Sequence, residues 1–248
     1  MSKLSDRIRK TNHTEPAPMG FAPIARTSSP TMLTLVRLAA GDTAKAADAA
    51  AKGADGVIID GIEPKKLKGQ DGKANGVVFG VRLHKAERNI VLSLKEAGAD
   101  FAVVDIASAA ADALLEENIG YVLLVPAEAD DTRLRLIADL GVDALLVQAP
   151  AQPVTVEGML ELRRIAALSR TPLLADVPAN ADATLLQILR DSGVAGVVIE
   201  GSALGKLASL RERIAALPAR GRRQEAHADA TVPAQASHDH GEDDDEDY

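Results

Sequence analysis

Gly53-Ala54-Asp55-Gly56-Val57-Ile58-Ile59-Asp60 is the first of four copies of one phrase. The other copies are residues 98–105 (GADFAVVD), 141–148 (GVDALLVQ) and 193–200 (GVAGVVIE). Each copy follows an Ala/Leu-rich stretch that is typical of a helix, and its glycine fits a helix C-cap with a left-handed backbone. The apolar run after the glycine is too short for a helix and fits a strand buried on both faces. The phrase therefore predicts a helix–turn–strand unit that ends on a polar side chain.

The four copies belong to a longer repeat. Residues 36–60 align with 81–105 without a gap and share Val-Arg-Leu at their start, and residues 125–148 align in the same way with 177–200 and share Val-Pro-Ala. Strands joined through helices are parallel, with right-handed crossovers. Eight such strands could form an open doubly wound sheet, but four equivalent units favour a closed ring, which has no edge strand. We therefore predict a single-domain α/β fold, a (βα)8 TIM barrel, over residues 31–218.

Composition limits the possible functions. Of the 248 residues 46% are hydrophobic and none is cysteine, which excludes disulfides, thiolate catalysis and cysteine-ligated metals. No run of about 18 apolar residues predicts a membrane span, and without a signal sequence the expected location is the cytoplasm. Residues 219–248 hold nine acids against three arginines, so most of the net charge of −8 lies there. The rest is nearly neutral and poor in aromatic residues, which argues against a nucleic-acid partner and weakens a flavin site.

The two ends of the chain differ from the repeat. Residues 1–30 are expected to form an N-terminal extended arm with a short helix over 4–10, and this arm could plug the barrel bottom, pack on a neighbour or act as a lid. Residues 219–248 are expected to form a disordered acidic tail, because like charges at this density repel. The tail could aid solubility, dock on a basic partner or hold a metal loosely. Within the barrel, a helix is expected over 108–117, and only a short one fits the polar connection 61–75.

Polar residues at the carboxyl ends of the strands converge in a closed barrel of this kind. The candidates for catalysis are Asp60, Asp105 and Glu200. The candidates for substrate binding are Arg37, Arg82, His84, Gln148, Asp176, Gly201 and Ser202.

Arg37 and Arg82 lie near the ends of apolar strands, where an unpaired guanidinium is costly to bury. Their partner could be an internal carboxylate, Asp60 or Asp105, because each arginine recurs 23 residues before an aspartate. It could instead be the carboxylate or phosphate of a substrate, held bidentately. Both interpretations remain open from the sequence.

The carboxylates allow two kinds of chemistry. One of them could act as a general base if burial raises its pKa, or several could hold Mg²⁺ through oxygen atoms, although no metal site is assigned. Gly201 and Ser202 open the last expected helix, where backbone N–H groups could bind a phosphate. Gln148 stands where a Schiff-base lysine would be needed, which disfavours that mechanism. The cofactor is unknown.

The phrase at residues 53–60 resembles the strand-2 region of aldolase-type and phosphate-binding TIM barrels in general. Residues 59–63 (IDGIE) and 81–84 (VRLH) also resemble citrate lyase β-subunit/HpcH-type aldolases. In that family an acidic end of strand 2 precedes a Val-Arg motif in strand 3 that binds an acidic acyl substrate. Pro126 and Gln148 stand where the family has its metal-binding acids.

These features predict a barrel enzyme, a lyase or isomerase, that acts on a small anionic metabolite at the carboxyl end of the strands. The alternative is a non-catalytic scaffold or assembly protein that uses its two unusual ends to bind partners. A homo-oligomer is compatible with either. The substrate, the reaction and the oligomeric state are beyond the sequence.

Overall fold

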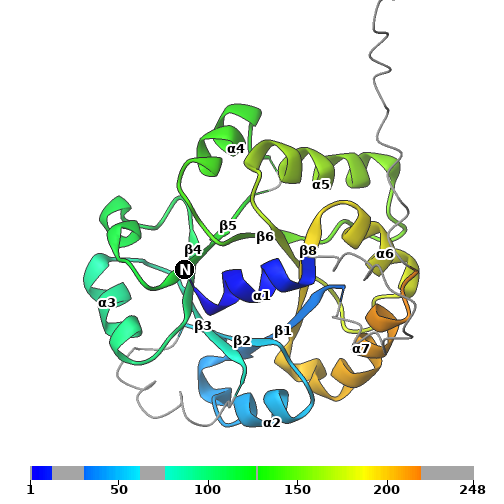
Figure 1. Cartoon of the computed structure of the whole chain (residues 1–248), viewed down its shortest axis with the longest axis horizontal. Helices are drawn as coiled ribbons and strands as arrows, with labels where there is room; N and C mark the ends of the chain where they lie inside the picture. Colours follow the sequence, from blue (N-terminus) through cyan, green and yellow to red (C-terminus); the bar gives the residue numbers. More distant parts are fainter. Residues whose placement is uncertain (1, 13–30, 62–75, 127, 219–248) are drawn as a thin grey trace, which may run out of the picture. The chain divides into compact units, whose positions relative to one another are not determined.

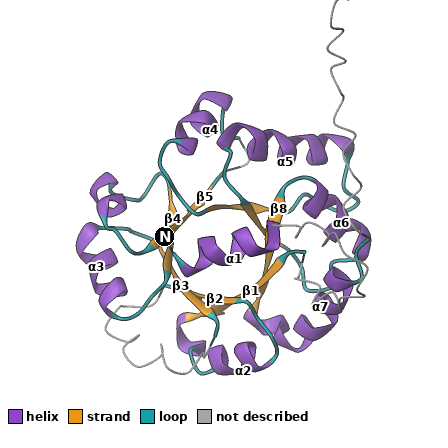
Figure 2. Ribbon diagram, in the orientation of Figure 1, coloured by secondary structure: helices purple, strands orange, loops and turns teal. Residues whose placement is uncertain are grey.

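The computed structural model describes residues 2–12, 31–61, 76–126 and 128–218. Eight parallel strands follow one another in chain order and close into a barrel (Figures 1 and 2). The ring is completed by β8 pairing with β1, which confirms the predicted (βα)8 fold. The strands are β1 (Leu33–Ala39), β2 (Gly56–Asp60), β3 (Val78–Leu83), β4 (Phe101–Asp105), β5 (Gly120–Leu124), β6 (Ala144–Gln148), β7 (Leu173–Asp176) and β8 (Val194–Glu200).

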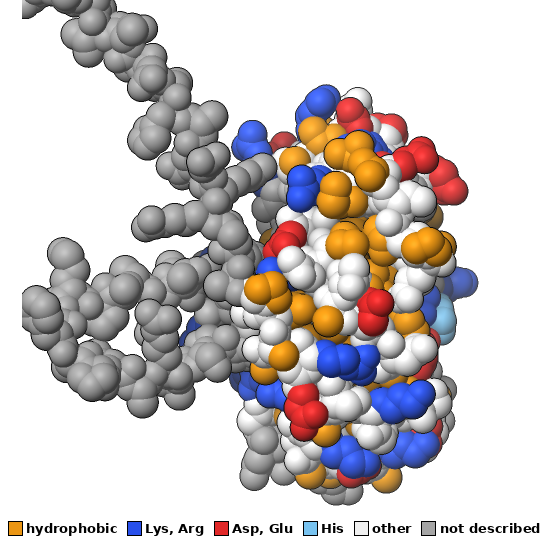
Figure 3. Space-filling model, turned by 90° about the vertical axis from the view of Figure 1, so that its right-hand side faces the viewer, with side chains coloured by type: hydrophobic (Ala, Val, Ile, Leu, Met, Phe, Trp, Pro, Cys, Tyr) orange, Lys and Arg blue, Asp and Glu red, His pale blue; other side chains and the backbone are white. Residues whose placement is uncertain are grey.

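Helices surround the barrel (Figure 2). They are α2 (Lys45–Ala51), α3 (Arg88–Glu96), α4 (Asp131–Ala138), α5 (Val156–Ser169), α6 (Ala183–Asp191) and α7 (Leu207–Ala215), with short 3-10 helices η1 (Ala40–Asp42), η3 (Ala111–Leu115) and η4 (Gly201–Lys206). None of the helices in the described ranges is long and apolar enough to cross a membrane. On the face seen in Figure 3, positive and negative side chains are interspersed with apolar ones.

Helix caps account for part of the repeated sequence. The Asp130 carboxylate accepts a hydrogen bond from the Arg133 amide, and Asp182, its equivalent in the second unit, accepts one from the Leu185 amide. Each bond satisfies one N–H group that a helix start leaves unpaired. The aspartate that recurs at 130 and 182 is therefore the cap of α4 and of α6.

Two expected helices differ from the structure. In place of a helix over 108–117, the chain forms only η3, because Ala109 bridges to Ala86 and the Ala110 amide donates to the Ala86 carbonyl. These bonds hold the segment extended where the first helical turn would begin. The last expected helix is divided into η4 and α7. The connection 61–75 lies outside the described residues after Gly61.

The core has two layers separated by the strands. Between strands and outer helices lies the larger apolar cluster, which includes Val57 and Ile59 of β2. Inside the barrel lies a second cluster, which includes Ile58 and the fully buried Phe101. Successive side chains of a strand alternate between these layers. The Phe101 ring occupies the space that a Cβ at Gly80 would need, so a glycine on β3 makes room for the largest side chain inside the barrel.

The amino-terminal end of the barrel is closed by α1 (Lys3–Asn12), which crosses the middle of the ring in Figure 1. Leu4 and Ile8 are about 1% exposed and join the interior cluster. Polar residues of the helix, and Ser2 just before it, bond to the aspartates of the repeated phrase. Ser2 donates to Asp143 at 2.5 Å, Lys3 pairs with Asp100 at 2.7 Å, and Arg7 donates to the Asp55 carbonyl at 2.8 Å. The helix expected over 4–10 is thus present, while the Pro-rich stretch 15–21 lies outside the described residues.

Candidate functional site at the carboxyl end of the barrel

Seven of the eight strands place a polar residue in the last inward-facing layer. Side chains alternate between the two faces of a strand, so the alternation that puts Leu35, Ile58 and Val103 inside the barrel also puts the strand-end residues inside. The strand register sets Arg37 beside Glu200, Asp60 beside Arg82, and Gln148 beside Asp176. The predicted residues of the strand ends therefore meet at one rim.

Arg37 is held by two carboxylates. Its Nη1 donates to Oδ2 of Asp176 at 2.9 Å, and its Nε and Nη2 donate to Oε1 of Glu200 at 2.9 and 2.5 Å. The side chain is 15% exposed. Burial disfavours its charge, but the bonds to Glu200 and Asp176 outweigh burial and raise the pKa of Arg37. Arg37 thus has internal carboxylate partners, one of the two alternatives, but they are Glu200 and Asp176 and not Asp60 or Asp105, because β1 closes the barrel against β8 and brings Glu200 next to it.

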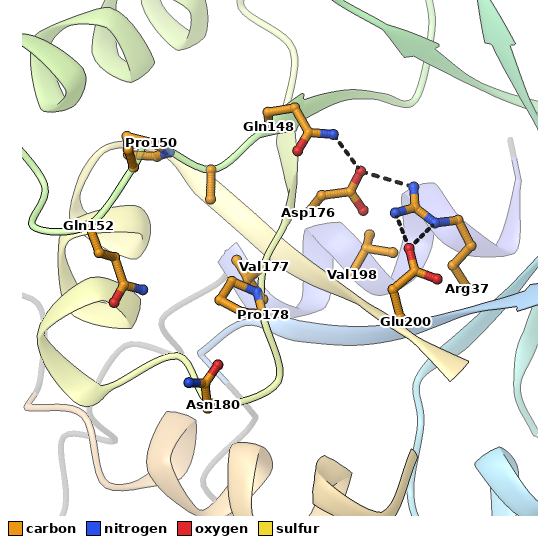
Figure 4. Close-up of a pocket in the computed structure, with 12 residues that line it drawn as sticks. Arg37, Gln148, Pro150, Gln152, Asp176, Val177, Pro178, Asn180, Val198 and Glu200 are labelled. Carbon is orange, nitrogen blue, oxygen red and sulfur yellow. Dashed lines mark hydrogen bonds and ion pairs between the residues drawn. The ribbon is translucent and has the colours of Figure 1, made fainter. Parts of the chain in front are cut away.

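Asp176 is the most enclosed carboxylate of the rim, with a side chain only 9% exposed. Its Oδ2 accepts from Arg37 and, at 3.1 Å, from Nε2 of Gln148 (Figure 4). Its Oδ1 is buried and has no hydrogen-bond partner among the described residues. Burial raises the pKa of Asp176, although Arg37 acts in the opposite direction.

Arg82 differs from Arg37 in its surroundings. Its contact with a carboxylate in the described ranges is a single long one, 3.4 Å from Nη1 to Oδ2 of Asp60, and the side chain is 29% exposed. Nε2 of His84 lies 3.4 Å from Oδ1 of the same aspartate. Gly61 lets the histidine approach, because it adopts φ +68° and a Cβ there would lie 3.3 Å from His84 Nε2. Asp60 thus stands between a guanidinium and an imidazole.

Two cavities open at the rim, and Arg37 and Glu200 line both. The smaller, of about 330 Å³, is also lined by Asp60, Arg82 and His84. The larger, of about 610 Å³, is lined by Gln148 and Asp176 and by residues of the loops after β6 and β7. Figure 4 shows Gln152 and Asn180 across this cavity from the chain of bonds that links Gln148, Asp176, Arg37 and Glu200. Both volumes suit a small metabolite.

Three predicted residues line neither cavity. The Asp105 carboxylate turns to its own loop and accepts from the Ala107 amide at 2.8 Å, so it does not pair with Arg82 as expected. Gly201 is buried, and a Cβ there would meet the Arg37 carbonyl at 3.0 Å. Ser202 is exposed at the start of η4. A phosphate site at Gly201 and Ser202 stays a prediction.

Sequence reasoning did not single out Gln152 or Pro150, which line the larger cavity. The signal available was their position in the loop after β6, because such loops build the sites of TIM barrels. In the ranges that the structure describes, no group of three or more His, Asp or Glu side chains is placed to hold a metal ion.

Comparisons with known proteins show the fold. No protein-family model matches the chain, and no curated protein matches it either. A mutant tryptophan synthase α-subunit from Pyrococcus furiosus is 15% identical with a TM-score of 0.58, over 73% of this chain and 96% of that one. Orotidine 5′-phosphate decarboxylase from Pyrococcus horikoshii OT3 is 13% identical with a TM-score of 0.57, over 73% of this chain and 100% of that one. At these identities the likeness establishes the TIM-barrel fold and nothing beyond it.

Proposed function

We propose that this chain is an enzyme that acts on a small anionic metabolite, a carboxylate or phosphate, by the proton transfer typical of a lyase or an isomerase. The observation that carries the proposal is the contrast between the two strand arginines. Arg37 has two carboxylates at hydrogen-bond distance, whereas Arg82 has one long contact in the described ranges and lines the smaller cavity. A guanidinium with unused donors in a concave site suits bidentate binding of a carboxylate or phosphate.

His84 and Asp60 supply the proton chemistry in this proposal. An imidazole changes charge near neutral pH, so it can take a proton from the carbon next to the group bound by Arg82. Asp60, 3.4 Å from Nε2, orients the ring and stabilises the imidazolium that forms. Return of the proton gives an isomerase, and loss of a leaving group from the neighbouring carbon gives a lyase.

Two resemblances agree with this class. The Val-Arg motif of citrate lyase β-subunit/HpcH-type aldolases binds an acidic acyl substrate, and Arg82 stands in the matching position. The name of orotidine 5′-phosphate decarboxylase denotes an enzyme with a phosphorylated substrate. The alternative of a non-catalytic scaffold depends on residues 13–30 and 219–248, outside the described ranges, and stays a prediction. So does a homo-oligomer.

The test is calorimetric titration of the full chain with succinate and with inorganic phosphate. Binding of at least one anion should be lost in Arg82→Met and kept in Arg88→Met, because Arg88 is a surface arginine paired with Glu116. Deuterium incorporation next to the carboxylate of a bound acid, followed by NMR in D₂O, should then require His84. Equal binding by Arg82→Met and the unchanged chain would contradict the proposal.

A further inference from the structure

The two rim cavities differ in their balance of charge. Among the described residues that line the larger one, the guanidinium of Arg37 faces the carboxylates of Asp176 and Glu200, and no other is ionisable. In the smaller one, Arg37 and Arg82 balance Asp60 and Glu200, and the lining also includes the His84 imidazole. The described lining of the larger cavity therefore has an excess of negative charge, whereas the described lining of the smaller cavity has none.

The negative charge of the larger cavity is incompletely compensated by Arg37. Both bonds from Arg37 to Glu200 fall on Oε1, so they leave Oε2 without a guanidinium contact, and Glu200 is 60% exposed. The Asp176 side chain is nine-tenths buried, and its Oδ1 lacks a partner in the described ranges. Its pKa stays raised by burial even with a guanidinium at 2.9 Å. A second cation would relieve this penalty.

A ligand that carries only negative charge would worsen the balance. The described residues that line the two cavities hold two guanidinium groups, Arg37 and Arg82, against three carboxylates, those of Asp60, Asp176 and Glu200. Like charges brought together in a partly enclosed site repel strongly. An anion on Arg82 is accommodated best if the same ligand brings a positive charge to the other cavity.

We infer that the ligand of this site is zwitterionic. Its carboxylate or phosphate binds Arg82 in the smaller cavity. Its protonated amine binds the exposed Glu200 carboxylate in the larger cavity, where the enclosed negative charge of Asp176 lies nearby. Arg37 and Glu200 line both cavities, so one molecule can extend past them. The amides of Gln148, Gln152 and Asn180 provide uncharged hydrogen-bond partners for the rest of the ligand. The inference rests on the proposed function for its anionic end only.

The test compares acids with and without a terminal amine. The probes are β-alanine, 4-aminobutanoate and 6-aminohexanoate, each against propanoate, butanoate or hexanoate of the same length, titrated calorimetrically into the full chain at pH 7. At one length the amine should tighten binding about tenfold, the size of one charge-assisted hydrogen bond. Glu200→Gln and Asp176→Asn should each reduce this gain towards one, and Glu200→Gln serves alone if Asp176→Asn unfolds.

Three results separate the inference from the proposed function. A gain from the amine that disappears in Glu200→Gln supports the inference. Arg82-dependent binding of the simple acids, with no gain from the amine at any length, overturns the inference and leaves the proposed function standing. Binding of the acids that does not depend on Arg82 overturns both.

Discussion

The two ends of the barrel use the same residue types in opposite ways. At the amino-terminal end, the carboxylates of Asp55 and Asp100 accept bonds from the backbone amides of the neighbouring strands, and α1 covers them. At the carboxyl end, Asp176 keeps a buried Oδ1 with no hydrogen-bond partner in the described ranges, and Oδ1 of Asp60 has only the approach of His84 Nε2 at 3.4 Å there. One end is therefore built for stability, and the other keeps polar capacity for a ligand, as is usual for this fold.

Phe101→Ala should have the largest effect on stability, because it removes packing at the amino-terminal end of the barrel, which α1 closes. The ring is fully buried in the interior cluster with Leu4 and Ile8 of α1, and its loss leaves a cavity. We expect the free energy of unfolding to fall by about 3–5 kcal/mol in urea titrations. Anion binding at Arg82 by the folded fraction should change little. A loss of stability below about 1 kcal/mol would show that this end is not the packed one.

Arg37→Met and Arg82→Met should lower the free energy of unfolding by different amounts. Removing Arg37 leaves the enclosed Asp176 carboxylate unpaired, which should cost about 2–4 kcal/mol of unfolding free energy. Removing Arg82 breaks one long, part-exposed contact and should cost less than about 1 kcal/mol. Urea unfolding of both variants measures the difference. Equal losses would mean that Arg82 is as structural as Arg37.

Gly61→Ala, beside His84 at the rim, and Gly141→Ala, away from the rim, form a pair of variants matched in backbone strain. Both glycines adopt φ +68°, so either alanine should cost about 1–2 kcal/mol of stability. Only the Cβ at position 61 meets a neighbour within 4 Å, the His84 ring, whereas the one at 141 enters open space. Deuterium incorporation into a bound acid should therefore fall in Gly61→Ala alone. The same rate in both variants would remove His84 and its placement from the mechanism.

The smallest expected effect is a difference in pH dependence between Asp143 and Asp130. Burial raises the pKa of Asp143 despite its bond from Ser2. Below the unfolded pKa of about 3.9 the carboxyl is protonated and costs no stability, whereas above the folded pKa its charge lowers the stability of the folded chain. Asp143→Asn should therefore become more stable relative to the unchanged chain as the pH rises from about 4.

Asp130 should show the opposite sign. The Arg133 amide bond lowers the pKa of Asp130, so its charge adds stability above the unfolded value, and this stability is lost as the pH falls through the folded pKa. Asp130→Asn should lose stability relative to the unchanged chain as the pH rises through this range. Urea unfolding at several pH values gives both trends, and trends of the same sign would contradict the assignment.

The sequence predicts the fold well because the repeated phrase encodes it locally. A C-cap glycine, a short apolar run and a terminal polar residue define each unit, and closure follows from repetition. The η3 segment could not be predicted, because its shape depends on bonds between Ala86 and residues 109–110, far apart in the chain. The helix propensity of residues 108–117 gives no information about that contact.

The rim could be predicted as a set of residues but not as a set of pairs. Arg37 pairs across the β1–β8 junction, which joins residues 163 positions apart. The fixed spacing of Arg and Asp suggested a partner within its own unit, and only the closed register reveals Glu200. The cavity loops after β6 and β7 carry no motif, so Gln152 and Pro150 needed coordinates to be found.

The most direct test observes both strand arginines in one experiment. In the full chain labelled with ¹⁵N-arginine, the Nε–Hε signals of Arg37 and Arg82, assigned with the two methionine variants, are followed while butanoate, which has no amine, is added. We predict that the Arg82 signal shifts with saturation while the Arg37 signal stays close to its starting position. A saturating shift of Arg37 with no change at Arg82 would contradict it.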